Sequence, residues 1–154
     1  MTNTQKCTNK DPVLQLDRYW PYLITVLADR IARRTSRLAK EEGLNLSQWR
    51  VLAAIADVPG RSSADVVSIT PMDKGIVSRA TKSLLVRGLI RKETSSLDGR
   101  IGHLFLTSTG LVLYQRLRPQ VSDVLHVTGL SQEEQVNFRI LIQQILKELP
   151  DENL

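Results

Sequence analysis

Five residues between positions 74 and 82 place basic, hydroxyl-bearing and small side chains on one side of a predicted helix. On a helix that advances about 100° per residue, one side carries Lys74, Gly75, Ser78, Arg79 and Lys82, and the other carries Ile76, Val77, Ala80 and Leu84. Arginine and lysine can grip phosphate or read guanine, serine can donate to either, and glycine permits close approach. The pattern predicts a helix that packs through a narrow apolar side and presents a nucleic-acid-binding side.

A second polar group precedes a short apolar strand in the stretch SSLDGRIGHLFL at 95–106. Asp98 and Arg100 form an oppositely charged pair around Gly99, and Leu104-Phe105-Leu106 follows. From Arg61 to Arg100 there are eight basic and four acidic residues, whereas from Ser131 to the end there are two basic and five acidic. Positive charge is therefore concentrated around the predicted helix, although 17–42 is also basic. Taken alone, a basic helix side is more often only solvated.

Caps, breaks and apolar spacing predict the helices that position these residues. Apolar residues at three- and four-residue steps predict a helix over 17–42, ended by Gly43. Capping-box patterns at Asn45 and Ser62 predict two more helices, the first ended by Pro59-Gly60. Thr70 as the cap and Pro71 in the first turn are expected to open the helix over 73–87. Leu85 is expected to point outward near the end of that helix, either beyond the groove or under the wing.

The second half of the chain predicts a hairpin followed by two helices. A strand begins at Leu89, a loop covers 94–100, and a strand returns over 101–107, with His103 solvated or near phosphate. A long helix begins at Thr107 and is bent or interrupted by Pro119. Gly129 breaks the chain, and a capping box at Ser131 opens the last helix. Short helices followed by a hairpin are the order of a winged helix-turn-helix.

Composition excludes several classes of protein. The chain has 154 residues, 42% hydrophobic and 24% charged, with a net charge of +5, which is typical of one small globular domain. No apolar run approaches the roughly 20 residues of a membrane span, and the start lacks a signal-peptide pattern. With Cys7 as the single cysteine, no internal disulfide can form. These features predict a cytoplasmic protein without a membrane partner.

Three stretches carry a resemblance to a known family. LNLSQWRVLAAIA, MDKGIVSRATKSLLVRGLIRKET and DGRIGHLFLTSTG, in this order and spacing, resemble the MarR family of bacterial transcription regulators. The most specific element is D-x-R followed by L-x-L-T-x-x-G, and the resemblance extends over roughly residues 20–149. It implies a mainly α fold with a small β-hairpin wing.

The resemblance also implies an organisation and a function. After a mobile tail over 1–15, a single domain covers 16–149, with dimerisation helices in 16–43 and 108–149 and a DNA-binding lobe in 44–107. The protein would be a homodimer, acting as a repressor on a pseudo-palindromic operator in double-stranded DNA. The recognition helix would be 73–87 and the wing 91–103, with Arg91 and Arg100 as DNA contacts and Asp98 orienting Arg100. Independently, the apolar stripes of the terminal helices need partners, which favours self-association over an intramolecular bundle.

The sequence also bears on effector, redox and enzyme functions. Family members often bind small anionic aromatics, and the pocket candidates are Tyr19, Trp20, Tyr22, Arg30 and Trp49; each is also a plausible core, interface or surface residue. Cys7 lies in a polar tail and is expected to be inert. His103 and His126 stand apart without metal-ligand spacing, and phosphate-loop and nucleophile-elbow patterns are absent. We therefore predict neither an enzyme nor a cofactor or metal site; the alternative is a winged-helix module that binds protein.

Overall fold

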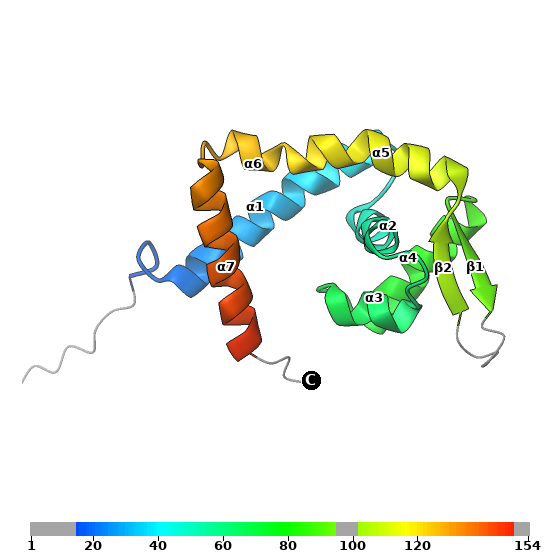
Figure 1. Ribbon diagram of the computed structural model, residues 1–154, viewed down its shortest axis with the longest axis horizontal. Helices are drawn as coiled ribbons and strands as arrows, with labels where there is room; N and C mark the ends of the chain where they lie inside the picture. The colour runs from blue at the N-terminus through cyan, green and yellow to red at the C-terminus, as the bar shows by residue number, and fades with distance from the viewer. Residues whose placement is uncertain (1–14, 95–101, 150–154) are drawn as a thin grey trace, which may run out of the picture.

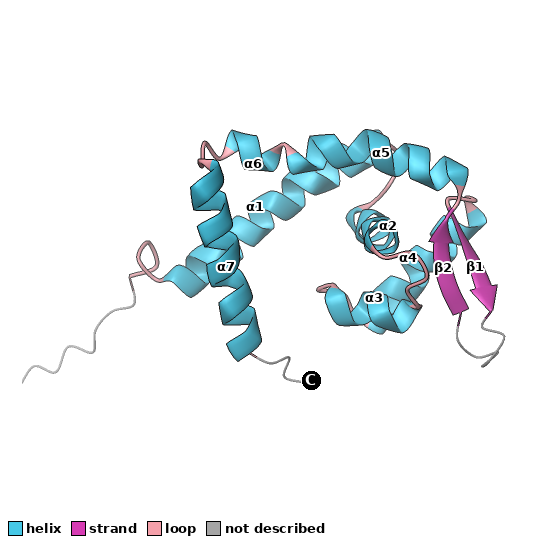
Figure 2. Cartoon of the chain, viewed as in Figure 1, coloured by secondary structure: helices cyan, strands magenta, loops and turns pink. Residues whose placement is uncertain are grey.

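The computed structural model describes residues 15–94 and 102–149 and consists of helices with one β-hairpin (Figures 1 and 2). In Figure 1 the hairpin and three helices gather in one lobe, and the terminal helices extend away from it. In chain order the elements are α1 (Trp20–Glu41), α2 (Leu46–Asp57), α3 (Ser63–Ile69), α4 (Lys74–Val86), β1 (Ile90–Thr94), β2 (Gly102–Leu106), α5 (Ser108–Ser122), α6 (Val124–Val127) and α7 (Gln132–Glu148). No helix within the described ranges is both long and apolar enough to span a bilayer.

Helix α1 begins three residues later than the apolar spacing predicts. Pro21 lies in its first turn, where a missing N–H breaks no helical hydrogen bond. Before it, residues 15–19 form a turn in which Arg18 N and Tyr19 N donate to Gln15 O. At the other end, Gly43 has a φ of 72°, and the amides of Gly43 and Leu44 bond back to the helix as predicted for a glycine stop.

The caps predicted for α2 and α3 are confirmed, but the residue predicted to cap α4 is wrong. Asn45 and Gln48 form a reciprocal capping box at α2, and Ser62 and Asp65 form another at α3. Thr70 does not cap α4; it ends α3, and its hydroxyl donates to Val66 O at 2.6 Å. The cap of α4 is Asp73, whose carboxylate accepts from Ile76 N at 2.7 Å. A carboxylate at the positive end of a helix outcompetes a hydroxyl for this role.

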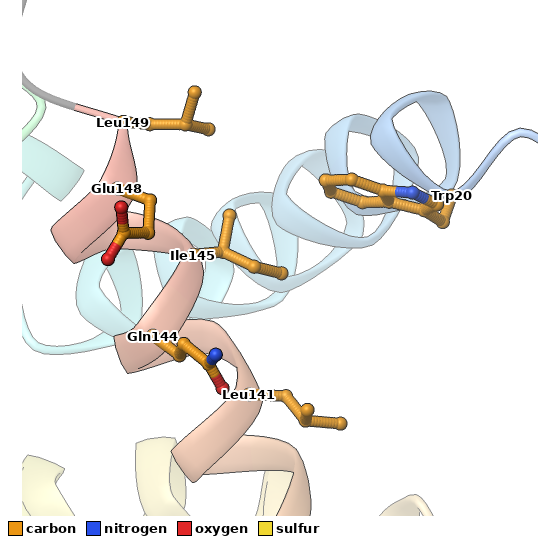
Figure 3. Close-up of a pocket in the computed structure, with 6 residues that line it drawn as sticks. All are labelled: Trp20, Leu141, Gln144, Ile145, Glu148 and Leu149. Carbon is orange, nitrogen blue, oxygen red and sulfur yellow. The ribbon is translucent and has the colours of Figure 1, made fainter.

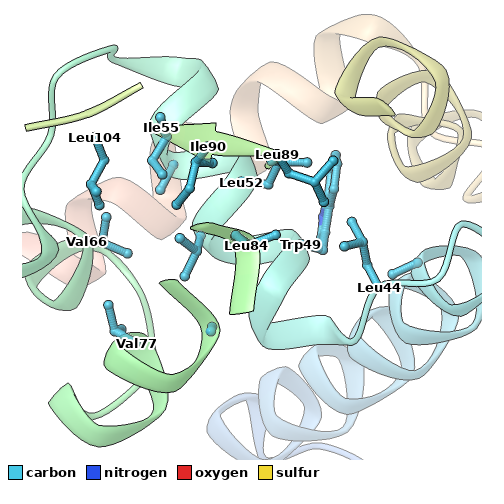
Figure 4. Close-up of a cluster of buried hydrophobic side chains, with 14 of the residues drawn as sticks. Leu44, Trp49, Leu52, Ile55, Val66, Val77, Leu84, Leu89, Ile90 and Leu104 are labelled. Atoms are coloured by element: carbon cyan, nitrogen blue, oxygen red, sulfur yellow. The ribbon is translucent and has the colours of Figure 1, made fainter. Parts of the chain in front are cut away.

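The hydrophobic core lies between α2, α3, α4, the hairpin and α5 (Figure 4). Leu52 and Ile55 of α2 meet Leu84 of α4, and Ile90 and Leu104 bring the two strands onto the same cluster. Trp49 is 7% exposed and stacks on Tyr114 of α5 with ring centroids 5.7 Å apart. The core therefore fixes the first half of α5 to the hairpin lobe.

Helix α5 continues through Pro119 instead of breaking there. It ends at Ser122, and α6 begins two residues later, at Val124, so the interruption falls at Asp123. The proline ring removes the N–H that would bond to Gln115 but its φ is already helical, and the amide of Asp123 still bonds to Pro119 O. Arg34 of α1 reaches Asp123 at 3.1 Å, joining the break to α1.

Helix α7 is formed but not packed. Its start has the predicted capping box between Ser131 and Glu134. None of its residues is buried, although it carries large apolar side chains such as Phe138, which is 42% exposed, and Leu141, which is 57% exposed. A helix is stabilised in proteins mainly by burying one face. The apolar side of α7 therefore requires cover that the single chain does not supply.

Candidate nucleic-acid interface

Helix α4 presents the basic side that its sequence predicts. Val77 and Leu84 are completely buried and Ala80 is 5% exposed, which seats the helix on the core. The five residues assigned to the opposite side all lie on the exposed surface: Lys74, Gly75, Ser78, Arg79 and Lys82. The Cβ position of Gly75 would lie 3.4 Å from the guanidinium of Arg79, so the basic head group lies along the first turn of the helix.

The packed side of α4 is wider than predicted. Leu85 was expected to point outward, but it is half-buried against the core; the outward residue is its neighbour Val86, which is 81% exposed. Thr81 is also buried, and its hydroxyl has no hydrogen-bond partner in the described structure. The difference arises because Gly88, at a φ of 65°, turns the chain back so that the last turn of α4 meets the hairpin.

Helix α3 lies beside α4 and forms a shallow cleft with it. Ser63, Ala64 and Val67 of α3 line this cleft of about 330 Å³ together with Lys74, Val77 and Ser78 of α4. The start of α3 is fixed by Asp65, which accepts from the amide of Ser62 at 2.7 Å and from its hydroxyl at 2.8 Å. These hydrogen bonds lower the pKa of Asp65 below its ordinary value, because they stabilise the carboxylate.

The hairpin is a two-stranded antiparallel wing in which Ile90 pairs with Leu106 and Thr94 with Gly102. Arg91 is exposed, forms an ion pair with Glu93, and lies with its guanidinium carbon 4.7 Å from the centroid of the Phe105 ring. Lys92, which the sequence-based selection omitted, is also exposed, and its side chain lies where Gly102 would carry a Cβ. Asp98 and Arg100, both predicted at the wing, lie outside the described residues, as does the tail before residue 15.

The wing is tied to the turn between α2 and α3. Gly60 N donates to Leu104 O at 2.9 Å, and Leu104 N donates to Arg61 O at 3.0 Å. His103, expected to be solvated, is half-buried, and its Nδ1 lies 2.8 Å from Gly60 O. A carbonyl oxygen only accepts, so Nδ1 carries the proton. Because its ring bonds to this turn, His103 has a structural role.

Arg61 contributes less to the basic surface than the charge count implies. Its side chain is only 18% exposed, forms an ion pair with Asp57 at 2.8 Å, and donates to Ala54 O at 2.7 Å. The guanidinium therefore closes the end of α2. Of the basic residues in this segment, those free to meet a large anion are on α4 and on the wing.

The T-x-x-G motif joins α5 to the end of α4. The hydroxyl of Thr107 accepts from Gly110 N at 3.1 Å and donates to Gly88 O at 2.6 Å. A Cβ on Gly110 would lie 1.9 Å from Leu89 O. Only glycine lets the first turn of α5 approach the backbone this closely, which gives the motif a physical cause.

The five residues predicted to line an effector pocket are not brought together. Trp49 is buried in the core of the hairpin lobe, whereas Tyr19, Trp20, Tyr22 and Arg30 are exposed on α1 or just before it. Trp20 instead lines apolar grooves between α1 and α7. No group of three or more potential metal ligands occurs within 15–94 or 102–149.

These observations first define a class of protein. A basic helix exposed on a helical core, beside a two-stranded wing, is the arrangement of a winged helix-turn-helix protein. The fold agrees: the match to a MarR-family transcriptional regulator from Silicibacter pomeroyi covers 91% of this chain and 96% of that one, with a TM-score of 0.79 and 23% sequence identity. A second likeness, to a mutant of MarR from E. coli in complex with operator DNA, has a TM-score of 0.69 at 19% identity and covers 82% of this chain and 92% of that one.

The sequence comparisons point to the same family as the fold. Residues 42–101 match the sequence model of the MarR family. The HTH-type transcriptional regulator YybA of Bacillus subtilis (strain 168) is 26% identical over 112 residues, which are 71% of this chain and 75% of that protein. The chain is therefore similar to MarR-family transcription regulators in its winged helix-turn-helix segment and in its fold.

Proposed function

We propose that this protein represses transcription by binding a pseudo-palindromic operator in double-stranded DNA as a homodimer. The observation that carries the proposal is the exposed basic side of α4, held by the buried Val77 and Leu84 on its other side. Residues near the start of a recognition helix contact base edges in the major groove. In this arrangement Lys74, Ser78 and Arg79 face the bases and Lys82 faces the phosphates, with Gly75 permitting close approach.

The wing supplies a second set of contacts. Arg91 and Lys92 are exposed on β1, where they can follow the DNA backbone beside the groove that α4 enters. Arg100, positioned by Asp98, is proposed as the minor-groove or phosphate contact on the basis of the family resemblance. A transcription regulator acts in the compartment that holds the DNA, in keeping with the predicted cytoplasmic location.

The dimer is supported by the uncovered apolar sides of α1 and α7. In Figure 3, Trp20 of α1 lies opposite Leu141, Ile145 and Leu149 of α7 across an open apolar groove of about 430 Å³. An adjoining groove of about 300 Å³ is lined by Leu23, Ile24, Leu27, Phe138 and Ile142 as well as Trp20, Leu141 and Ile145. A second copy brings matching apolar helices of the same length, and such isologous contacts close into a two-fold dimer.

A small anionic aromatic effector that releases the DNA remains a proposal that follows from the family resemblance alone. Tyr19, Trp20, Tyr22, Arg30 and Trp49 do not form one pocket in the chain. An effector site built on any of these residues would need further residues beside it, and equilibrium dialysis of the purified protein against small aromatic carboxylic acids would test whether it binds this class of ligand.

Random-site selection with the purified full chain tests the proposed function. We expect enrichment of an inverted repeat whose half-site centres lie about one helical turn apart, bound more weakly as the salt concentration rises. Arg79→Ala is the matched variant, since it removes one basic group from the exposed side of α4. Recovery of no preferred sequence by the wild-type protein would refute DNA-sequence recognition and favour a winged-helix module that binds protein.

A further inference from the structure

The last turn of α4 is bonded to the turn just after α1, to α2 and to the start of α5. Arg87, the residue that ends α4, donates from Nη1 to Gly43 O at 2.8 Å. Ser83, one turn earlier, accepts from Gln48 Nε2 at 2.7 Å. The carbonyl of Gly88 accepts from the hydroxyl of Thr107. We refer to Gly43, Gln48, Ser83 and Arg87 as the α1–α4 junction.

Gln48 has a role in the junction that its cap pattern does not reveal. Its side chain is 9% exposed, and its Oε1 accepts from the amide of Asn45 at 2.8 Å to complete the capping box of α2. The other end of the same amide group reaches across to Ser83. One buried side chain therefore joins the start of α2 to the recognition helix.

Arg87 is an exposed basic residue at the C-cap of α4, and its guanidinium bonds to the backbone instead of to an acidic side chain. Its guanidinium bonds to the carbonyl of Gly43, and its Nη2 lies 3.6 Å from where Gly43 would carry a Cβ. The neighbouring Glu42, 18% exposed in its side chain, forms an ion pair with Arg116 of α5 at 3.0 Å. The end of α1 is thus bonded to both α4 and α5.

We propose that Arg87 and the Gln48–Ser83 hydrogen bond are positioning elements that set the separation of the two recognition helices in the dimer. The inference rests on the proposed function. α1 carries the apolar side assigned to the dimer interface, so a rigid joint between α1 and α4 fixes each recognition helix relative to the two-fold axis. Half-site spacing in dimeric DNA-binding proteins follows from this distance. Arg87 thereby acts on DNA through Gly43, without contacting it.

The test measures how affinity depends on half-site spacing. Duplexes carrying the inverted repeat selected by the wild-type full chain are made with the spacer shortened or lengthened by one and two base pairs. Affinities are measured by fluorescence anisotropy for wild type, Arg87→Ala, Arg87→Lys and Ser83→Ala. Ser83→Ala removes the acceptor on α4 while leaving the capping box of Gln48 intact.

We expect the wild type to discriminate sharply between spacers and the variants to discriminate less. The ratio of affinities between the preferred spacer and its neighbours should fall by about five- to 25-fold for Arg87→Ala and for Ser83→Ala, because each substitution removes one hydrogen bond in each of the two copies. Arg87→Lys, whose ammonium can still donate to Gly43 O, should recover part of the ratio. The slope of log affinity against log salt should stay unchanged.

Lys82→Ala is the matched control, because it removes a basic residue of α4 outside the junction. It should weaken binding equally at every spacer and reduce the salt slope by about two, one for each copy of the dimer. The proposal is overturned if Arg87→Ala behaves as Lys82→Ala does, which would make Arg87 a phosphate contact. It is also overturned if both junction variants keep the wild-type spacer profile, whatever their melting temperatures. The wild-type selection tests the proposed function, and only the difference between wild type and variants tests the junction.

Discussion

Replacing Gly110 with alanine should destabilise the protein, although alanine favours helices more than glycine does. The added Cβ would lie 1.9 Å from Leu89 O and 2.9 Å from its carbonyl carbon, and real Cβ atoms essentially never approach closer than 3.0 Å. The first turn of α5 must therefore move by about 1 Å or more away from the end of α4. Because the obstacle is backbone, no side-chain rotation relieves it.

The magnitude follows from the contacts that this movement breaks. Thr107 N bonds to Leu89 O at 3.1 Å, and the Thr107 hydroxyl bonds to Gly88 O at 2.6 Å. Two hydrogen bonds contribute about 2 kcal/mol, whereas the lower chain entropy of alanine in the unfolded state returns about 0.4–1 kcal/mol. We expect a net loss of about 1–2 kcal/mol in the free energy of unfolding.

Gly75→Ala is the matched control, because Gly75 also lies in the first turn of a helix. The atoms near its Cβ position are side-chain ends, Asp73 Oδ1 at 3.2 Å and Arg79 Nη1 at 3.4 Å. We expect this variant to differ little from wild type, because the gain from alanine is offset by the small shift it requires of Asp73 Oδ1, which caps α4. Urea unfolding followed by circular dichroism, at one protein concentration because the proposed dimer would make stability depend on concentration, measures both. Equal stability of the two alanine variants would refute the close approach of α5 to Leu89.

The remaining predictions concern the interface, the dimer and pH. Arg79→Ala should weaken binding to the selected site by about 1–3 kcal/mol more than binding to random DNA; equal losses would make Arg79 a phosphate contact. Leu141→Glu should raise the Kd of the proposed dimer roughly 100-fold or more, because two leucines that the interface would bury are lost. Val58→Glu, outside α1 and α7, is the control and should leave the dimer intact. Sedimentation velocity measures both, and a dimeric Leu141→Glu protein would contradict the assignment. Asp65→Ala should lower stability at neutral pH, and its difference from wild type should vanish as the pH falls below 3.8 and through the lowered pKa of Asp65; a difference independent of pH would show that the carboxylate charge is not involved.

Local signals predicted most of the fold because they act within a few residues of the chain. The capping boxes at Asn45, Ser62 and Ser131 form as their spacing indicates, and Gly43 and Gly88 end helices with positive φ. The exposed side of α4 also follows directly from its helical period, since tertiary packing has to bury the only apolar side available.

Other features depended on contacts between distant segments, which periodicity does not encode. Leu85 turns inward because the hairpin returns beside the end of α4, and His103 is half-buried because the turn at Gly60 lies against β2. The cap at Asp73 was missed because Thr70-Pro71 offered a competing local pattern. Gly110 belongs to a motif visible in the sequence, but the contact that requires a glycine there, with the backbone of Leu89, comes from a segment far away in the chain.

The effector candidates, which no observation here tests, are spread over the chain for a related reason. Aromatic type and nearness in sequence grouped Tyr19, Trp20 and Tyr22, but Trp49 is separated from them by the full length of α1 and stacks on Tyr114 instead. Large aromatics are selected for burial and interfaces as often as for ligands. The exposed Trp20, at 53%, lines grooves between α1 and α7 that belong to the proposed dimer interface.

The affinity of the wild-type dimer for its selected inverted repeat, relative to a random duplex of the same length, tests the central claim most directly. Anisotropy titrations at physiological salt should give a ratio of about 10³ or more, the range of specific DNA-binding proteins, and scrambling one half-site should remove most of it. A ratio near one, with the same salt dependence for both duplexes, would show only attraction between a basic surface and a polyanion and would contradict sequence recognition by α4.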